Sequence, residues 1–361
     1  MTRVTRAVIN LSALRHNLSI ARRHAPGSHI LAIIKANAYG HGSVPVAQAL
    51  DQADAFGVAC LDEAITLREA GIAQPIVLLE GVVHAADLNL VRGYQLELVV
   101  HHPAQIDLLE QVGGSAIPVW LKLDTGMHRL GITAPQVTEV LQRLGRLETV
   151  AQPVRLMTHL ANADDRQDDT TPRQVERFDS ATAELKLEAS IANSAGILAW
   201  PETHRDWVRP GIMLYGVSPL VDSSGVEHEL QPVMSLHSEL IAVNQRRQGD
   251  PIGYGGIYRC PADMPVGVVA IGYGDGYPRH APGGTPVLVN GMRAPLIGRV
   301  SMDMICVDLR DCPEAGIGDP VVLWGAALPV EEIASQAGTI GYELLCQVTQ
   351  RVPLEYHHGD I

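Results

Sequence analysis

The sequence predicts an α/β protein in which an N-terminal (β/α)8 TIM-type barrel is followed by a C-terminal mostly-β domain. Two observations predict the barrel: short apolar runs alternate with helical stretches over about 210 residues, and eight such runs occur. A third observation predicts the second domain, because after about residue 225 helical periodicity fades and short strands with glycine-rich turns follow. An open doubly wound sheet uses the same alternation and is the alternative fold.

The first predicted element is a helix with Leu11, Leu14 and Leu18 on one face and Asn10 or Ser12 as its cap. Buried barrel strands are then predicted at His29–Ala36, Ala55–Cys60, Pro75–Glu80, Glu97–Val100, Pro118–Asp124, Val154–Leu160, Ala189–Asn193 and Trp207–Leu214. Helices are predicted between them at Cys60–Ala70, Pro103–Val112, Pro135–Leu147 and Pro172–Leu187. Barrel enzymes place their chemistry at the carboxyl ends of such strands.

The remaining chain predicts a sheet with one late helix at Val330–Val348. Its strands are predicted at Met234–Val243, Pro265–Ile271, Pro286–Val289, Ala294–Leu309 and Pro320–Leu323. We therefore divide the chain into a barrel domain, residues 1–228, and a β domain, residues 229–361. Residues 1–9 are expected to add a strand to the β domain.

Composition excludes several classes of protein. Apolar residues make up 46% and charged residues 19%, which allows a large core and excludes global disorder. The net charge of −13 argues against a nucleic-acid partner. We find neither a signal peptide nor an apolar stretch near the ~20 residues of a membrane helix. Five scattered cysteines predict neither disulfides nor a metal site, so we expect a cytoplasmic protein.

The most informative segment is Leu31–Gly42, in which Lys35 ends an apolar strand. A charged ammonium at such a position is costly unless it is paired or neutral. A lysine with a lowered pKa is the type used in Schiff-base chemistry. A lone lysine at a strand end more often extends its charge to solvent, so this residue alone decides little.

The segment Lys35-Ala-Asn-Ala-Tyr39-Gly-His-Gly42 closely resembles the lysine motif of alanine racemases, fold-type III enzymes that use pyridoxal 5'-phosphate (PLP). The resemblance covers nearly the whole chain, through Val119–Gly131, Met157–Leu160, Ile191–Gly196, Val208–Gly216, Tyr254–Tyr258, Ile271–Gly276 and Gly298–Asp303. It implies a barrel plus a β domain and an obligate head-to-tail homodimer that interconverts L- and D-alanine. D-Alanine made in this way would supply peptidoglycan synthesis.

The resemblance also implies two acid/base residues on opposite faces of the substrate Cα. Lys35 would hold PLP covalently and act on one face, and Tyr254 of the partner subunit would act on the other. Because a free tyrosine ionises near 10, a chain from Tyr254 to His159 to Arg209 would favour the phenolate. Taken alone, Tyr254 is an ordinary turn residue and His159 an ordinary strand-end histidine.

Arg209 is predicted on the eighth strand, facing the pyridine nitrogen of PLP. Since arginine keeps its proton in proteins, that nitrogen should stay unprotonated and the ring should accept electrons weakly. Such a ring would limit transamination and favour return of the proton to Cα. The alternative is an arginine paired with Asp206.

The cofactor phosphate is expected beyond strands seven and eight, where barrels commonly bind phosphate. The resemblance places on it Tyr39, Ser194, Gly211 and Ile212, while Asn193 is expected near the cofactor ring or its hydroxyl. The alternative for Gly211 is a simple turn after Pro210.

The resemblance assigns the substrate carboxylate to Arg129 and to the backbone of Met302 from the partner subunit. Lys122 shares a strand face with Asp124 and is carbamylated in many relatives, so we hypothesise a carbamate that anchors Arg129. Gln350 precedes Arg351-Val-Pro353 where some relatives have a tyrosine on the phosphate, which suggests a looser entry and larger substrates. Residues lining the entry path are expected to be Tyr273, Arg279, Arg299 and Asp303.

Three alternatives stay open or are disfavoured. A racemase of serine or another amino acid is poorly distinguished by sequence. A fold-type III PLP decarboxylase should use an acidic partner for the ring nitrogen and a β-domain cysteine, so Arg209 and Tyr254 argue against it. A non-catalytic PLP carrier lacks the β domain, which the last 130 or so residues provide here.

Overall fold

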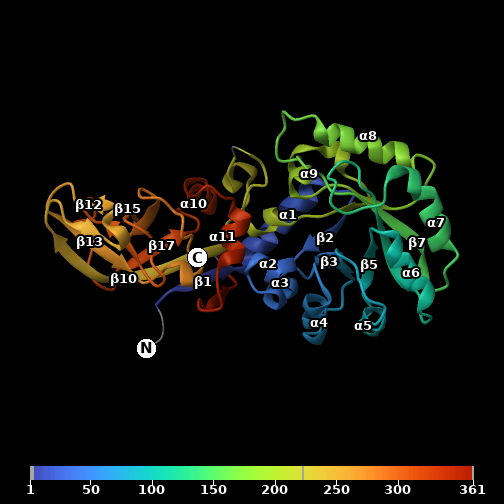
Figure 1. Cartoon of the computed structure of the whole chain (residues 1–361), viewed down its shortest axis with the longest axis horizontal. Coiled ribbons are helices and arrows are strands. Elements are labelled where there is room, and N and C mark those ends of the chain that lie inside the picture. Colours follow the sequence, from blue (N-terminus) through green and yellow to red (C-terminus); the bar gives the residue numbers. More distant parts are fainter. Residues whose placement is uncertain (1–3, 222, 360–361) are drawn as a thin grey trace.

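The computed structural model describes residues 4–221 and 223–359. Figure 1 shows a barrel with its helices at one end of an elongated molecule and a strand-rich domain at the other. The N-terminal strand and the C-terminal red segments lie in the strand-rich part, whereas the blue-to-green chain between them builds the barrel. No helix among the described residues has the length and apolar character needed to cross a membrane.

The barrel confirms the predicted fold class. Its eight strands are parallel and pair in sequence order, and the last pairs with the first to close the ring. The strands are β2 (His29–Ile33), β3 (Ala55–Val58), β4 (Ile76–Leu78), β5 (Glu97–Val100), β6 (Ile117–Lys122), β7 (Val150–Met157), β8 (Ala189–Ser190) and β9 (Trp207–Val208). All eight overlap the predicted runs, and all but β2, β6 and β7 are buried along their whole length, as parallel strands should be.

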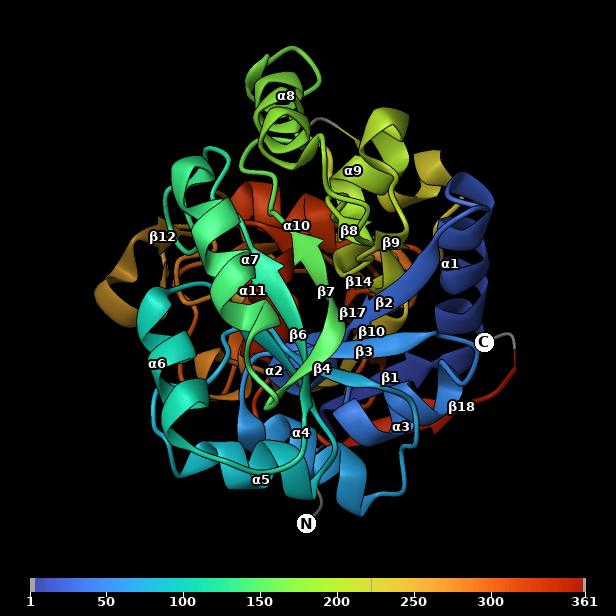
Figure 2. The same cartoon turned by 90° about the vertical axis from the view of Figure 1, so that its right-hand side faces the viewer.

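Helices surround the barrel, as Figure 2 shows looking along it. They are α1 (Leu11–His24), α3 (Ser43–Ala49), α4 (Leu61–Glu69), α5 (Asp87–Gly93), α6 (Pro103–Gln111), α7 (Val137–Gly145), α8 (Thr170–Thr182) and α9 (Ser194–Ala199). The predicted cap of the first helix is Asn10, whose side chain accepts from the N–H groups of Ser12 and Ala13. A short segment, α2 (Lys35–Tyr39), follows β2.

The last two barrel strands are shorter than predicted. They end at Ser190 and Val208, so Arg209 directly follows β9 and does not lie on the strand. Pro210 has no N–H with which to continue the strand ladder. Arg209 still donates its backbone N–H to the carbonyl of Ala192, which holds it at the barrel rim.

The second domain is an eight-stranded sheet in the order β13-β16-β15-β14-β17-β10-β1-β18. Strand β1 (Arg6–Asn10) lies between β10 and β18 and pairs with both. The other strands are β10 (Met234–Arg246), β13 (Met264–Val269), β14 (Pro286–Val289), β15 (Met292–Ile297), β16 (Ile305–Asp308), β17 (Pro320–Trp324) and β18 (Leu354–His357). A separate hairpin is formed by β11 (Pro251–Ile252) and β12 (Tyr258–Arg259).

Two predictions in this domain were too coarse, and both fail at a glycine. The predicted strand Ala294–Leu309 is divided into β15 and β16 by a loop that begins at Gly298, with φ of +70°. The predicted helix Val330–Val348 is two helices, α10 (Val330–Ala337) and α11 (Gly341–Gln347), because Gly338 caps the first in a left-handed conformation. Strand β18 lies beyond the predicted elements.

Candidate active site

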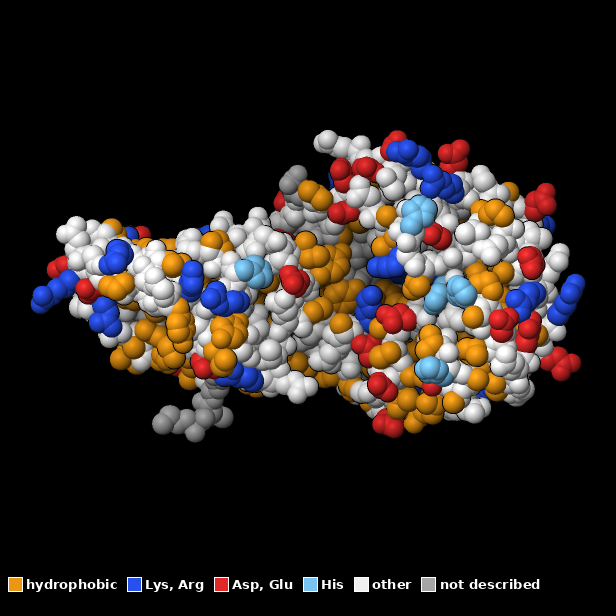
Figure 3. Space-filling view, viewed as in Figure 1, with side chains coloured by type: hydrophobic (Ala, Val, Ile, Leu, Met, Phe, Trp, Pro, Cys, Tyr) orange, Lys and Arg blue, Asp and Glu red, His pale blue; other side chains and the backbone are white. Residues whose placement is uncertain are grey.

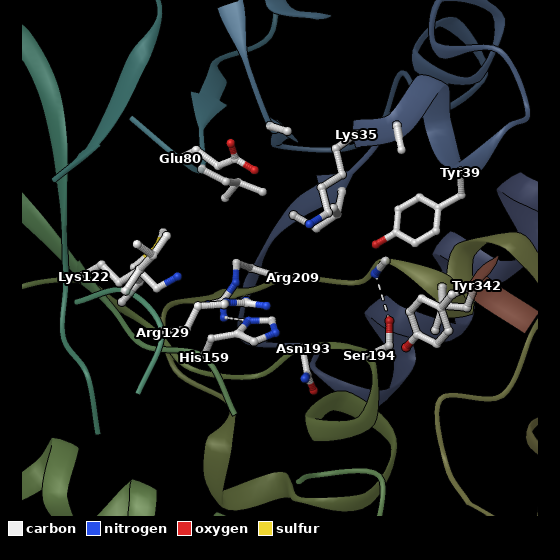
Figure 4. Close-up of a pocket in the computed structure, with 18 of the residues that line it drawn as sticks. Lys35, Tyr39, Glu80, Lys122, Arg129, His159, Asn193, Ser194, Arg209 and Tyr342 are labelled. Carbon is white, nitrogen blue, oxygen red and sulfur yellow. Dashed lines mark hydrogen bonds between the residues drawn. The ribbon is translucent and has the colours of Figure 1, made fainter. Parts of the chain in front are cut away.

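A cavity of about 510 Å³ lies at the carboxyl ends of the barrel strands, within the range of small-molecule sites. Helix α11 of the second domain contributes to its wall. Ten predicted site residues line it: Lys35, Tyr39, Lys122, Arg129, His159, Asn193, Ser194, Arg209, Gly211 and Ile212. Figure 4 shows that the labelled side chains converge from opposite walls of the cavity.

Lys35 and Tyr39 enter the cavity from the turn that follows β2. Ring stacking fixes the tyrosine, because Tyr39 packs on Tyr215 with ring centroids 4.7 Å apart and faces Tyr342 at 6.1 Å. Burial raises the pKa of Tyr39, so its phenol stays protonated and can donate. In Figure 4 the Tyr39 hydroxyl and the Lys35 amine lie on the same side of the cavity.

Arg209 is a buried cation whose described partners are neutral. Its guanidinium donates to Ser190 Oγ at 2.7 Å and to the carbonyls of Thr158 at 2.6 Å and Ile191 at 3.2 Å. The alternative pairing with Asp206 is not found, because that carboxylate accepts from the N–H of Ala189. Burial lowers the pKa of Arg209 to about 10, so it remains charged at neutral pH.

His159 lies against this guanidinium, with Nη2 of Arg209 3.2 Å from its Nδ1. Burial, followed by the positive charges of Arg209 and Lys122, lowers the pKa of His159 well below its ordinary value. Arginine can only donate, so Nδ1 accepts and the proton of the neutral ring lies on Nε2. The imidazole can therefore donate toward the cavity.

Ser194, Gly211 and Ile212 form a small concave cradle beside Tyr39. Ser194 Oγ accepts from the backbone N–H of Gly211 at 2.8 Å, and Asn193 caps α9 through Gly196. A Cβ at Gly211 would lie 2.7 Å from Oη of Tyr39, so a side chain there would fill the cradle. This close approach, rather than the turn alone, explains the glycine.

The cavity is strongly cationic. Lys35, Lys122, Arg129 and Arg209 line it, and Glu80 is the one carboxylate among the described lining residues. Burial, with the charges of Arg209 and Arg129, lowers the pKa of Lys122 to about 8. Asp124 opposes this shift only in part, and its Oδ1 accepts from the N–H groups of Gly126 and His128. The site therefore has the charge to bind several anionic groups.

Six predicted residues do not line the cavity of this chain. They lie in the β domain, where Tyr254 and Tyr273 each begin a short 3-10 helix and the others lie in loops: Tyr254, Met302, Tyr273, Arg279, Arg299 and Asp303. Tyr254 is 68% exposed and Met302 53% exposed, so both side chains are accessible to another molecule. Figure 3 shows that hydrophobic side chains gather on the surface of the β domain as well as around the barrel.

Tyr342 is one of the lining residues that were not predicted from the sequence, and it brings a phenol into the cavity. It lies on α11 one turn before Cys346, which also lines the cavity. The spacing of four residues on an amphipathic helix was the available signal. Gln350 is not among the lining residues, and α11 brings a phenol into the cavity from Tyr342 instead. The looser entry stays a prediction.

Comparisons with known proteins agree along the whole chain. Family models described as the N-terminal and C-terminal domains of alanine racemase match residues 9–219 and 233–356. Alanine racemases of Aeromonas hydrophila and Coxiella burnetii are each 52% identical, with alignments covering 97–98% of this chain and 98% of theirs. The crystal structure of the biosynthetic alanine racemase from Pseudomonas aeruginosa superposes with a TM-score of 0.96 at 47% identity, covering 99% of this chain and all of that one. The chain belongs to the alanine racemase family.

Proposed function

We propose that this protein interconverts L- and D-alanine with PLP as cofactor, through Lys35 of one subunit and Tyr254 of its partner. The observation that carries the proposal is the cavity itself. It joins a lysine at a strand end to a buried arginine and to a cradle that a single Cβ would fill. The D-alanine would supply peptidoglycan synthesis. The enzyme would act in a reducing cytoplasm, where its free thiols persist.

The residues present fit PLP. The cradle around Gly211, with the Ser194 hydroxyl and the Tyr39 phenol, has the donors and the space for a phosphate. Arg209 would donate a hydrogen bond to the pyridine nitrogen. Its partners Ser190 and Thr158 are neutral, so they do not offset its positive charge. Tyr342 would add a second phenol to the phosphate side, facing Tyr39.

PLP, when bound, would supply an electron-withdrawing ring that acidifies the Cα–H of an attached amino acid. Lys35 would hold the cofactor through Nζ and, once released by substrate, move the proton at one face of Cα. Arg209 can donate a hydrogen bond to the ring nitrogen but does not give up its proton, so that nitrogen would remain unprotonated. An unprotonated ring favours return of the proton to Cα over transamination. Arg129 would bind the substrate carboxylate.

The second acid/base would come from another copy of the chain. Tyr254 and Met302 are exposed on the β domain, whereas the cavity is built from the barrel and α11. In a head-to-tail homodimer, Tyr254 of the partner would reach the opposite face of Cα and accept from the Nε2–H of His159. Met302 would bring its backbone to the carboxylate, with Tyr273, Arg279, Arg299 and Asp303 along the entry.

Lys122 is proposed to carry a carbamate. Its pKa of about 8 makes the neutral amine, which attacks CO₂, available near neutral pH. The amine nitrogen bonds to the CO₂ carbon and loses a proton, which turns a cation into an anion. That anion would offset the charge of Arg129 and hold it toward substrate.

The experiment is incubation of the PLP-loaded protein with L-alanine, followed by chiral chromatography. The expected result is D-alanine, approaching equal amounts of the two enantiomers. L-Serine in parallel measures substrate breadth, and Lys35→Ala is the control that should form no D-alanine. A protein that binds PLP but yields no D-alanine would contradict the proposal.

A further inference from the structure

The turn that carries Lys35 and Tyr39 has an unusual backbone. Four consecutive residues that are not glycine, Ala36 to Tyr39, have φ between +52° and +54°. This left-handed conformation costs an L-residue roughly 1–2 kcal/mol each. Such a run persists only where surrounding contacts over-determine it, and here it lies directly after the reactive lysine.

Glu63 holds the first peptide of this turn. From the first turn of α4, its Oε1 accepts from the backbone N–H of Ala36 at 2.6 Å, and its Oε2 accepts from that of Ala59 at 2.8 Å. Both are charge-assisted hydrogen bonds, which are about twice as strong as neutral ones. One carboxylate thus ties the turn after β2 to the loop after β3.

The two ends of Lys35 are therefore fixed separately. On the amino side, the carbonyl of Ile34 belongs to the peptide bond that precedes Lys35, and it accepts from the N–H of Ala38 at 2.9 Å. On the carboxyl side, the N–H of Ala36 belongs to the peptide bond that follows Lys35, and Glu63 accepts it. The direction of the Lys35 side chain depends on both peptide planes.

The far end of the turn is closed by other groups, whereas the side chain of Glu63 accepts at its lysine end. His41 is fully buried, and its Nδ1 contacts the carbonyls of Ala38 and Tyr39 at 3.0 and 2.9 Å. The side chain of Asn37 accepts from the N–H of Ser43. These contacts hold Tyr39 and leave the Lys35–Ala36 peptide to Glu63.

We infer that Glu63 is a positioning residue that aims the Lys35 amine at Cα. The inference rests on the proposed function of Lys35 and deepens it. A displacement of about 1 Å in a reacting group can cost about 100-fold in rate. Loss of this carboxylate should therefore weaken the step that Lys35 performs, while the step performed by Tyr254 of the partner is spared.

The first test measures the backbone without cofactor. In Glu63→Gln the side chain has nearly the same shape, but its NH₂ group faces one of the two N–H donors and cannot accept from it. Hydrogen–deuterium exchange of the cofactor-free protein should be faster at Ala36 and Ala59 than in the wild type. The matched control is Asp62→Asn, the exposed neighbour on the same turn, which should leave that exchange unchanged.

The second test uses the two enantiomers separately. Exchange of the Cα–H of L- and D-alanine with D2O is measured in PLP-loaded wild type, Tyr254→Phe and Glu63→Gln. Glu63→Gln should slow exchange about 10- to 100-fold for the enantiomer whose exchange survives in Tyr254→Phe, and much less for the other. A merely structural role would slow both enantiomers equally.

The outcomes separate this inference from the proposed function. If Tyr254→Phe itself shows no preference for one enantiomer, the two-base proposal fails. If it does show one and Glu63→Gln slows both enantiomers alike, or leaves exchange at Ala36 unchanged, the role of Glu63 is overturned. Should Glu63→Gln not fold, Glu63→Asp, which keeps the charge but shortens the reach, should give the same asymmetry.

Discussion

Nη2 of Arg209 lies 3.2 Å from Nδ1 of His159, a permanent cation against a buried imidazole. The geometry forces the imidazole to accept at Nδ1, and burial with the neighbouring charges lowers its pKa. A neutral His159 with its proton on Nε2 is the donor that a partner phenolate would need. Arg209 and the buried surroundings therefore set the charge and the tautomer of His159 within a single chain, before any second subunit binds.

The first prediction concerns pH and stability. Unfolded histidine titrates near 6.5, whereas burial lowers the pKa of His41 to about 4 and lowers that of His159 as well. Below about pH 6.5 the unfolded chain binds more protons than the folded one, so the free energy of unfolding falls with acidification. Each histidine contributes at most about 1.4 kcal/mol per pH unit.

Urea unfolding of the cofactor-free protein between about pH 7 and pH 5 checks this prediction. His159→Asn keeps a group that can accept from Arg209 but removes the titration, so the pH dependence of its unfolding free energy should be shallower. An identical slope in wild type and variant would mean that His159 titrates as it does in the unfolded chain.

The second prediction tests the phosphate cradle. In Gly211→Ala the new methyl would meet Oη of Tyr39 at 2.7 Å, so the tyrosine must move. We expect PLP to bind at least about tenfold more weakly, a loss of about 1.4 kcal/mol, with the fold retained. Absorbance titration with PLP measures the effect.

Gly145→Ala is the control for that substitution, since a Cβ there meets nothing within 4 Å at the end of α7. It should bind PLP as the wild type does. Equal affinity in Gly211→Ala would show that the phosphate does not lie in the cradle.

The third prediction concerns Lys122. Intact-mass measurement under gentle ionisation, or a high-resolution density map, should show one CO₂ on this side chain. Removal of CO₂ and bicarbonate should lower activity, and their return should restore it, because the carbamate would hold Arg129. A plain amine at Lys122 in protein that is fully active would refute the carbamate.

The fourth prediction tests the shared site. Lys35→Ala and Tyr254→Phe would each be inactive alone, but a mixed dimer would contain one site with both native residues. Random co-assembly should therefore restore about a quarter of all sites, and the heterodimer isolated through both tags should have about half of its sites restored. Co-expression of the two variants with separate tags, followed by purification through both tags and an assay, measures this. If both residues served the same subunit's site, the mixture would be no more active than the single variants.

The barrel could be predicted from sequence because each of its strands is a local apolar run. Arg209 was predicted to lie on the strand because the apolar run continues to Leu214, although Pro210, which has no N–H for the strand ladder, was the local signal that the strand ends earlier. It was harder to predict where an element ends when the end depends on one residue in a left-handed backbone conformation. Gly298 and Gly338 each interrupt an element that the apolar pattern alone continues.

Some residues of the candidate site could be predicted from the sequence and others could not. Lys35 and His159 were predicted from the resemblance of their motifs, and both line the cavity because the barrel brings the carboxyl ends of its strands together. Tyr342 was missed because it comes from a helix of the other domain, and its approach depends on how the two domains pack. The hydrogen bond from Ala36 to Glu63 has no sequence signal, because it depends on a left-handed turn formed by residues other than glycine.

The most direct test of the account follows deuterium during racemisation. PLP-loaded protein is incubated with L-alanine in D2O. At early times the enantiomers are separated, and the deuterium content of each is measured by mass spectrometry. A two-base site predicts that D-alanine carries deuterium at Cα from its first appearance, because a second residue protonates the opposite face with a solvent-derived proton. D-Alanine that retains the original hydrogen would contradict the two-base site, and absence of D-alanine from PLP-bound protein would contradict the activity.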